Sequence, residues 1–129
     1  GASSGNPGPS GAGAVMLYGE HRKEISKYLG NTTNNVAELT AIQIALAHLK
    51  NTTKTVVIYT DSSYALGVLT KGWKAKKNRS LIEKIKKQMV QFKALSFIKV
   101  AGHAGIPENE RADQLAVKAI TAASNIKKT

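Results

Sequence analysis

The stretch TVVIYT at residues 55–60, followed directly by Asp61, decides the fold. Its β-branched and aromatic residues favour a strand. Because they are continuous rather than alternating with polar residues, we expect a buried parallel strand that is covered on both faces. Asp61 then opens a short helix that runs to about Leu69 and is broken by Gly72. A buried strand that leads into a helix indicates an α/β domain.

Three segments precede this strand. Residues 1–11 are rich in glycine, proline and serine, which predicts an irregular loop with tight turns. Residues 12–18 and 21–29 are predicted to form the arms of a β-hairpin. From residue 36 to residue 49 the apolar spacing becomes helical, which predicts an amphipathic helix.

The rest of the chain alternates between helix and strand. Residues 81–89 have the apolar spacing of a second amphipathic helix, and residues 95–100 form a further strand. A glycine-containing loop at 101–106 then leads to a last helix, with Pro107 in its first turn and its end at Ile120. The pattern predicts a mixed sheet with helices packed against it, in one domain at residues 1–123 with a flexible tail at 124–129.

The composition is strongly basic, with 19 Lys and Arg against 8 Asp and Glu and a net charge of +11. A general basic surface would explain the total, but the charge is clustered, which favours a phosphate-binding face. The cluster consists of Lys71, Lys74, Lys76, Lys77, Arg79, Lys84, Lys86 and Lys87. The absence of cysteine excludes disulfides and thiolate metal sites. No apolar run approaches the ~20 residues needed to cross a bilayer, so we expect a soluble, cytoplasmic protein.

Three carboxylates are candidates for catalysis, and each also has an ordinary structural explanation. Glu38 follows Asn35 by three residues, so the pair could form a variant capping box. Glu38 also falls on the apolar stripe of its helix, which would place the carboxylate at the edge of the buried face. Asp61 could be a helix N-cap, yet it also stands where α/β sheets bind ligands, beyond the carboxyl end of a strand.

Asp113 is the third candidate. A carboxylate near the start of a helix often only complements the helix dipole. Asp113, however, shares a stripe with Ala116, Val117 and Ile120 that should face the sheet. A charge on a buried stripe needs a partner, and a metal ion would be one. His103, in the glycine-containing loop, is either a solvated side chain or, beside a carboxylate cluster, a proton shuttle.

Four short motifs occur in one order along the chain. They are GASSGNPGP at 1–9, NNVAEL at 34–39, YTDS at 59–62, and GHAG at 102–105 with NERAD at 109–113. In this order they resemble the motifs of type 1 ribonuclease H, including the ribonuclease H domains of reverse transcriptases. The resemblance implies the ribonuclease H-like fold: a mixed five-stranded sheet with helices on both faces, whose first, central strand is absent from this sequence.

The resemblance also implies an activity and its residues. The chain would be an endonuclease that cleaves the RNA strand of RNA/DNA hybrids by a two-metal-ion mechanism and produces 5′-phosphomonoesters. Glu38, Asp61 and Asp113 would hold two Mg²⁺ ions, with Mn²⁺ as a possible substitute, and His103 would assist proton transfer or product release. The expected state is a monomer.

The resemblance further implies a set of substrate-binding residues. Asn6, Asn34 and Asn35 would recognise the hybrid backbone and the 2′-hydroxyls, which distinguish RNA from DNA. Thr33 and Asn78 would line a pocket for a phosphate of the DNA strand. Trp73 would pack along the DNA-binding channel, or would be a plain helix anchor. Gly1, Ser3 and Ser63 complete the expected substrate contacts.

Two departures from the family pattern stand out. The stretch from Thr70 to Asn78 is too short for the protruding basic handle of many members, and its lysines would partly replace that grip. The first catalytic aspartate of the family should stand immediately before Gly1, so we expect this sequence to be a segment of a longer molecule. The alternative is a catalytically incomplete module that binds the hybrid without cutting it.

Overall fold

The computed structural model of the chain describes residues 2–3, 5, 7–18, 21–49, 55–60, 62–99, 110–111 and 114–115. The strands are β1 (Ala2–Ser3), β2 (Gly8–Tyr18), β3 (His21–Thr32), β4 (Thr55–Thr60) and β5 (Ala94–Lys99). The helices are α1 (Asn34–His48), α2 (Ser63–Thr70) and α3 (Arg79–Met89). Four further residues, Glu110, Arg111, Gln114 and Leu115, are helical within the predicted last helix.

The described strands form two sheets rather than one. Strands β1, β2 and β3 are antiparallel in that order, and β4 pairs with β5 in parallel. The prediction that residues 1–11 form only an irregular loop is wrong, because β1 lies there and β2 already begins at Gly8. Both residues of β1 pair with β2, and among the described residues no ladder joins the two sheets.

The predicted hairpin is confirmed, with longer arms than expected. Its register runs from Tyr18 opposite His21 to Gly8 opposite Thr32, with an irregularity between Ser10 and Gly11. Gly30, near this bulge, has a φ of 74°, a conformation that glycine adopts without strain. The buried Ser10 donates its hydroxyl to the carbonyl oxygens of Gly8 and Thr32, at 2.9 and 3.0 Å. These bonds fix the end of β3 just before α1 begins.

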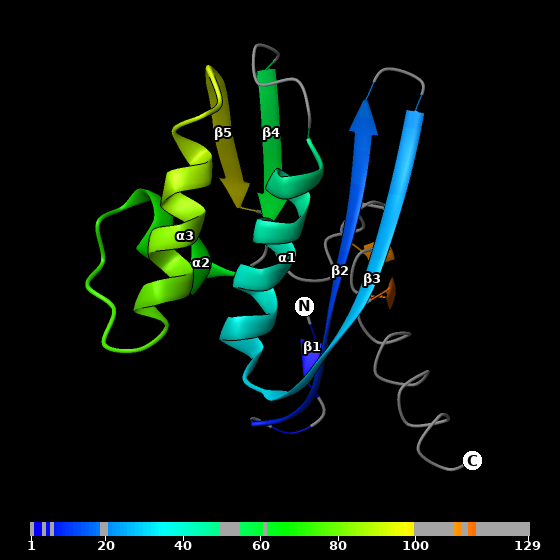
Figure 1. Cartoon of the computed structure of the whole chain (residues 1–129), viewed down its shortest axis with the longest axis vertical. Helices are drawn as coiled ribbons and strands as arrows, with labels where there is room; N and C mark the ends of the chain where they lie inside the picture. Colours follow the sequence, from blue (N-terminus) through cyan, green and yellow to red (C-terminus); the bar gives the residue numbers. More distant parts are fainter. Residues whose placement is uncertain are drawn as a thin grey trace.

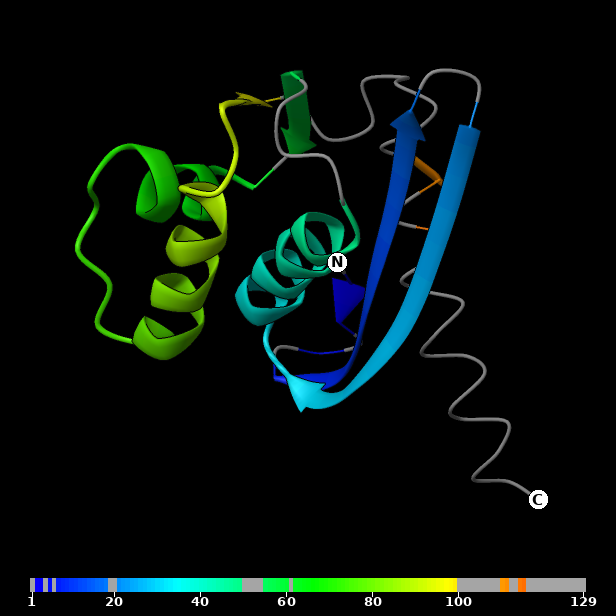
Figure 2. The same cartoon turned by 45° about the horizontal axis from the view of Figure 1, so that its top comes forward.

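Helix α1 lies between the hairpin and the other two helices (Figures 1 and 2). Apolar side chains from all three helices form one buried core with Phe92, and residues of β4 and β5 pack against it. The buried members are Leu39, Ile42, Leu46, Ala65, Val68, Leu69, Ile82, Ile85 and Phe92. The helices predicted at 36–49 and 81–89 are thus confirmed, because their periodic apolar residues are those that the core buries.

The prediction that β4 is covered on both faces is wrong. Val56 and Ile58 pack against the helical core, whereas Val57 and Tyr59 are 40% and 52% exposed. Side chains of a strand alternate between its two faces, and the described helices cover only one of them. The parallel pairing with β5 is nevertheless as expected. The hydrophobicity of the strand is continuous, but its burial alternates.

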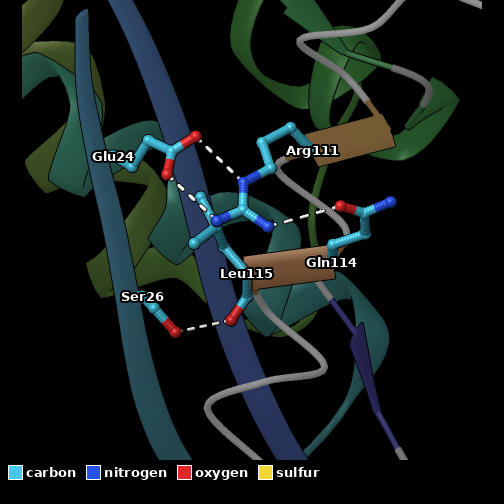
Figure 3. A network of polar contacts seen from close by, with 5 residues as sticks. All are labelled: Glu24, Ser26, Arg111, Gln114 and Leu115. Carbon is cyan, nitrogen blue, oxygen red and sulfur yellow. Dashed lines mark hydrogen bonds and ion pairs between the residues drawn. The ribbon is translucent and has the colours of Figure 1, made fainter.

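Several predictions fall outside the described residues. They concern the hairpin turn at Gly19 and Glu20, the loop at 101–106, most of the last helix and the tail at 124–129. The described part of the last helix lies on the face of the hairpin away from α1 (Figures 2 and 3). Described helical residues therefore lie on both faces of the β1–β2–β3 sheet, as the fold prediction requires.

Candidate active site

Helix α1 begins with a threonine cap. Thr33 is extended, with φ −98° and ψ 163°, and its hydroxyl accepts a hydrogen bond from the Val36 N–H at 3.3 Å. The capping-box interpretation of Asn35 and Glu38 is therefore wrong, because the N-cap is Thr33 and Glu38 follows it by five residues rather than three. Asn34 and Asn35 are exposed in the first turn of the helix.

Glu38 lies at the edge of the buried face of α1. Its neighbours Ala37 and Leu39 are fully buried, while Glu38 itself is half-buried. On its own stripe, Ile42 is buried and Ala45 is half-buried. This is the position predicted for a carboxylate that serves chemistry, with one side against the protein and one side toward solvent.

The backbone on both sides of Asp61 is fixed by hydroxyl groups. Ser62 caps α2, with its Oγ accepting from the Ala65 N–H at 3.0 Å. The Ser62 N–H donates to Oγ1 of the buried Thr60 at 3.1 Å. Asp61 itself lies outside the described residues, but its interpretation as an N-cap is wrong, because Ser62 occupies that position. Ser63 is exposed at the first position of α2.

Trp73 packs against the glycine of α2. The backbone N–H of Trp73 donates to the Gly67 carbonyl at 3.2 Å, and a Cβ built on Gly67 would lie 2.1 Å from Cε3 of the indole. Only a residue without a side chain allows this approach. The contact agrees with the helix-anchor interpretation of Trp73. Half of the side chain remains exposed, at 50%, and its place along a DNA channel stays a prediction.

Asn78 connects α2 to α3. It adopts a left-handed conformation with φ 64°, which asparagine tolerates better than most residues, and its carbonyl accepts from the Ile82 N–H. Its Nδ2 donates to the Tyr64 hydroxyl at 3.3 Å instead of capping α3. Thr33 and Asn78 mark the starts of α1 and α3, which lie at the same end of the molecule (Figures 1 and 2). Their shared phosphate pocket stays a prediction.

The predicted basic cluster lies on α3 and on the segment that links it to α2. All of its members are exposed except Lys86, which is half-buried. Arg79 Nε donates to the Ala75 carbonyl at 2.9 Å, which ties the linking segment to the start of α3. The cluster therefore places exposed positive charge along both the linking segment and α3.

Five of the predicted site residues lie outside the described residues. They are Gly1, Asn6, Asp61, His103 and Asp113. Ser3 belongs to β1, where it pairs with Ser10. Within the described ranges no group of three histidine or carboxylate side chains could hold a metal ion. Glu38 is the one member of the predicted carboxylate set that these ranges contain.

Polar contacts that the sequence did not predict join the last helix to β3 (Figure 3). Arg111 donates from Nε and Nη2 to the two carboxylate oxygens of Glu24, at 2.9 and 3.1 Å. Its Nη1 donates to Oε1 of Gln114 at 3.3 Å, and Ser26 Oγ donates to the Leu115 carbonyl at 2.5 Å. The hydrogen bond and charge of Glu24 raise the pKa of the Arg111 guanidinium above its ordinary value.

Comparison with known proteins decides the family. A sequence model of the family described as RNase H matches residues 1–121, nearly the whole chain. The chain belongs to the RNase H family. A ribonuclease H of Desulforamulus reducens is 47% identical over 134 residues, which cover 92% of this chain and 82% of that protein. The predicted resemblance is thereby confirmed, and the chain is a ribonuclease H enzyme.

Solved structures of RNase H proteins share the fold. RNase H1 from Halobacterium salinarum aligns with a TM-score of 0.80 and 30% identity, over 94% of this chain and 92% of that one. LC11-RNase H1, solved in complex with an RNA/DNA hybrid, aligns with a TM-score of 0.74 and 30% identity, over 95% and 93%. Among the described residues of the present chain, no helix is long and apolar enough to cross a bilayer.

Proposed function

We propose that this RNase H hydrolyses the RNA strand of RNA/DNA hybrids with two Mg²⁺ ions, bound by Glu38, Asp61 and Asp113. The observation that carries the proposal is the family match over residues 1–121, a range that contains all three carboxylates. The position of Glu38 supports it, because the first turn of α1 is capped by Thr33 and Glu38 stands at the edge of the core.

The donor set fits magnesium. Mg²⁺ prefers hard oxygen ligands, and the chain offers carboxylates and no thiolates. Paired ions supply an activated water and neutralise charge on the scissile phosphate. The protein's own groups position the substrate and move protons. The imidazole of a histidine can take up and release a proton near neutral pH, so His103 would transfer a proton or assist product release. Mn²⁺ is a possible substitute, and the products would carry 5′-phosphate and 3′-hydroxyl ends.

Substrate recognition would use two parts of the surface. Asn34 and Asn35, exposed at the start of α1, would join Asn6 in contacting the backbone and 2′-hydroxyls. The exposed lysines between α2 and α3 would bind phosphates without regard to sequence. The hybrid bound to the related LC11-RNase H1 supports this substrate class. We further propose that the enzyme acts as a cytoplasmic monomer.

The test is cleavage of a strand-labelled RNA/DNA hybrid in Mg²⁺, with hybrid binding measured in the same samples. We expect cuts in the RNA strand that require the metal, and a loss of at least about 100-fold in Asp61→Asn and in Glu38→Gln. The matched control is Glu83→Gln, which removes one exposed carboxylate charge from α3 and should cut normally. Tight binding without cuts would instead identify a catalytically incomplete hybrid-binding module.

A further inference from the structure

We propose that Glu24 is a positioning residue for catalysis, which through Arg111 holds the start of the last helix and with it Asp113. The inference rests on the proposed function, in which Asp113 is a metal ligand. Glu24 contributes no group to the reaction itself. Its role is to fix, from within strand β3, where the segment at 110–115 lies.

The contact has the geometry of a clamp rather than of a chance ion pair. Both oxygens of Glu24 accept hydrogen bonds from two nitrogens of one guanidinium, at 2.9 and 3.1 Å. Such a bidentate pair fixes orientation as well as distance, which a single lysine ammonium cannot do. Gln114 accepts the third hydrogen bond of Arg111, so the plane of the guanidinium is held from both sides (Figure 3).

A second contact prevents rotation about the first. Ser26, two residues along the same strand and therefore on the same face as Glu24, donates to the Leu115 carbonyl. Its partner across the ladder is Gly13, which adds no side chain beside it. Arg111 and Leu115 are one helical turn apart, and Asp113 lies between them in the sequence, two residues from each. The two anchors thus bracket the aspartate.

The strand that carries both anchors is paired with β2 on both sides of them. Glu24 lies opposite Val15 within the antiparallel ladder between β2 and β3, with paired residues on both sides of it. The ion pair is only partly shielded, with side-chain exposures of 36% for Arg111 and 30% for Glu24. Pairs of this exposure contribute little to global stability. Its effect is therefore expected in the placement of the helix, where catalysis is sensitive to displacements of about 1 Å.

The test compares Glu24→Gln with Glu83→Gln, which changes the net charge equally but lies on α3. The first readout is the Mg²⁺ concentration for half-maximal cleavage, together with kcat and the KM for hybrid. For Glu24→Gln we expect the Mg²⁺ concentration at half-maximal cleavage to rise about three- to tenfold. We expect kcat to fall and KM to change less than about twofold. Glu83→Gln should show neither change in metal dependence nor in kcat.

The second readout is independent of activity. Amide hydrogen exchange of the peptide spanning 110–115 should be at least about threefold faster in Glu24→Gln than in the wild type, with the exchange of α1 unchanged. The reversed pair, Glu24→Arg with Arg111→Glu, should restore slow exchange and the original Mg²⁺ dependence. Arg111→Lys, with Glu24 unchanged, should show the same faster exchange and the same raised Mg²⁺ requirement as Glu24→Gln, because lysine lacks the bidentate fork.

The two proposals fail in different ways. If the wild-type protein does not cut hybrids, the proposed function fails, and the exchange measurement alone decides whether the clamp holds the helix. If the wild type cuts and Glu24→Gln has normal exchange and normal Mg²⁺ dependence, the positioning role is wrong. Faster exchange without a change in Mg²⁺ dependence or kcat would also overturn it, because Glu24 would then be merely structural.

Discussion

Among the described residues, the two faces of the β1–β2–β3 sheet make different kinds of contact. On one face α1 packs against β2 and shares a dry core with α2 and α3, in which Leu39, Val68 and Ile85 are almost completely buried. On the other face, the described contacts of the last helix with β3 are polar, made by Glu24 and Ser26, and Leu115 is the buried apolar residue.

The difference affects how firmly the proposed metal ligands on the two faces of the sheet are held in position. The burial of several apolar side chains stabilises α1 strongly, and salt does not screen this stabilisation. We therefore expect α1 to hold Glu38 in a fixed position. Hydrogen bonds and a partly exposed ion pair contribute less free energy than apolar burial, but they depend on the direction of donor and acceptor and so fix orientation. Salt screens the ion pair. The described part of the last helix, which flanks the proposed metal ligand Asp113, thus makes direction-specific contacts with β3, while the apolar core holds α1.

The largest expected effect comes from breaking the apolar side. Leu39→Ala removes a fully buried side chain from the shared core and should lower the free energy of unfolding by about 3 kcal/mol, measured by urea denaturation. The control Leu81→Ala truncates a partly buried leucine on α3 and should cost roughly half as much. Equal losses at the two positions would show that the core is not concentrated where the structure places it.

The next effect tests the contact between α2 and its following segment. Gly67→Ala forces a methyl group into the indole of Trp73 and should cost about 1–3 kcal/mol of unfolding free energy. Trp73 is the only tryptophan, so its fluorescence should shift to longer wavelength as the ring leaves α2. In a Trp73→Ala background the same change should be neutral or stabilise by up to about 1 kcal/mol, because alanine favours helix over glycine. A cost that persists there would contradict the contact.

The elements that the sequence predicted best are those whose signal is local. Helices α1 and α3 follow from apolar periodicity, and β4 follows from six consecutive strand-forming residues, whose bounds the structure reproduces at Thr55–Thr60. In these segments the apolar residues whose spacing predicts the helix or strand are also residues that pack against the core and stabilise it. Glu38 could be placed at the edge of the core for the same reason.

The caps were harder to predict, because neighbouring residues compete for the same position. Asn35 and Asp61 are both good N-cap residues, yet Thr33 and Ser62 hold the caps. The choice depends on where the preceding strand ends, and for β3 this end is fixed by the buried Ser10, which bonds to Thr32 from 22 residues away. Both corrections remove an ordinary structural explanation for a proposed metal ligand.

Long-range contacts left no signal in the sequence. Glu24 and Arg111 are 87 residues apart in the sequence. Other charged residues lie near each of them, and the sequence does not show which of these charges form an ion pair. The exposure of Val57 and Tyr59 was likewise unpredictable, because it depends on which face the helices cover rather than on the strand itself. Their hydrophobicity alone indicated burial.

A smaller effect separates the cap from its neighbour. Ser62→Ala removes the acceptor for the Ala65 N–H and should lower the free energy of unfolding by about 1 kcal/mol. Ser63→Ala, one residue later and exposed, should change it by less than about 0.5 kcal/mol. Thermal unfolding followed by circular dichroism measures both. If the two variants melt alike, Ser62 does not cap α2, and the N-cap interpretation of Asp61 would have to be reconsidered.

The smallest expected effect lies on the polar side of the sheet. Ser26→Ala removes the hydrogen bond to the Leu115 carbonyl and should cost about 0.5–1 kcal/mol, the net value of one such bond. Ser96→Ala, exposed on β5, is the matched control and should cost less than about 0.5 kcal/mol. Urea denaturation measures both changes. A loss as large as that of Leu39→Ala would mean that this helix is held by the global core after all. A loss within the stated range, with faster exchange confined to residues 110–115, would show that direction-specific contacts hold the helix locally.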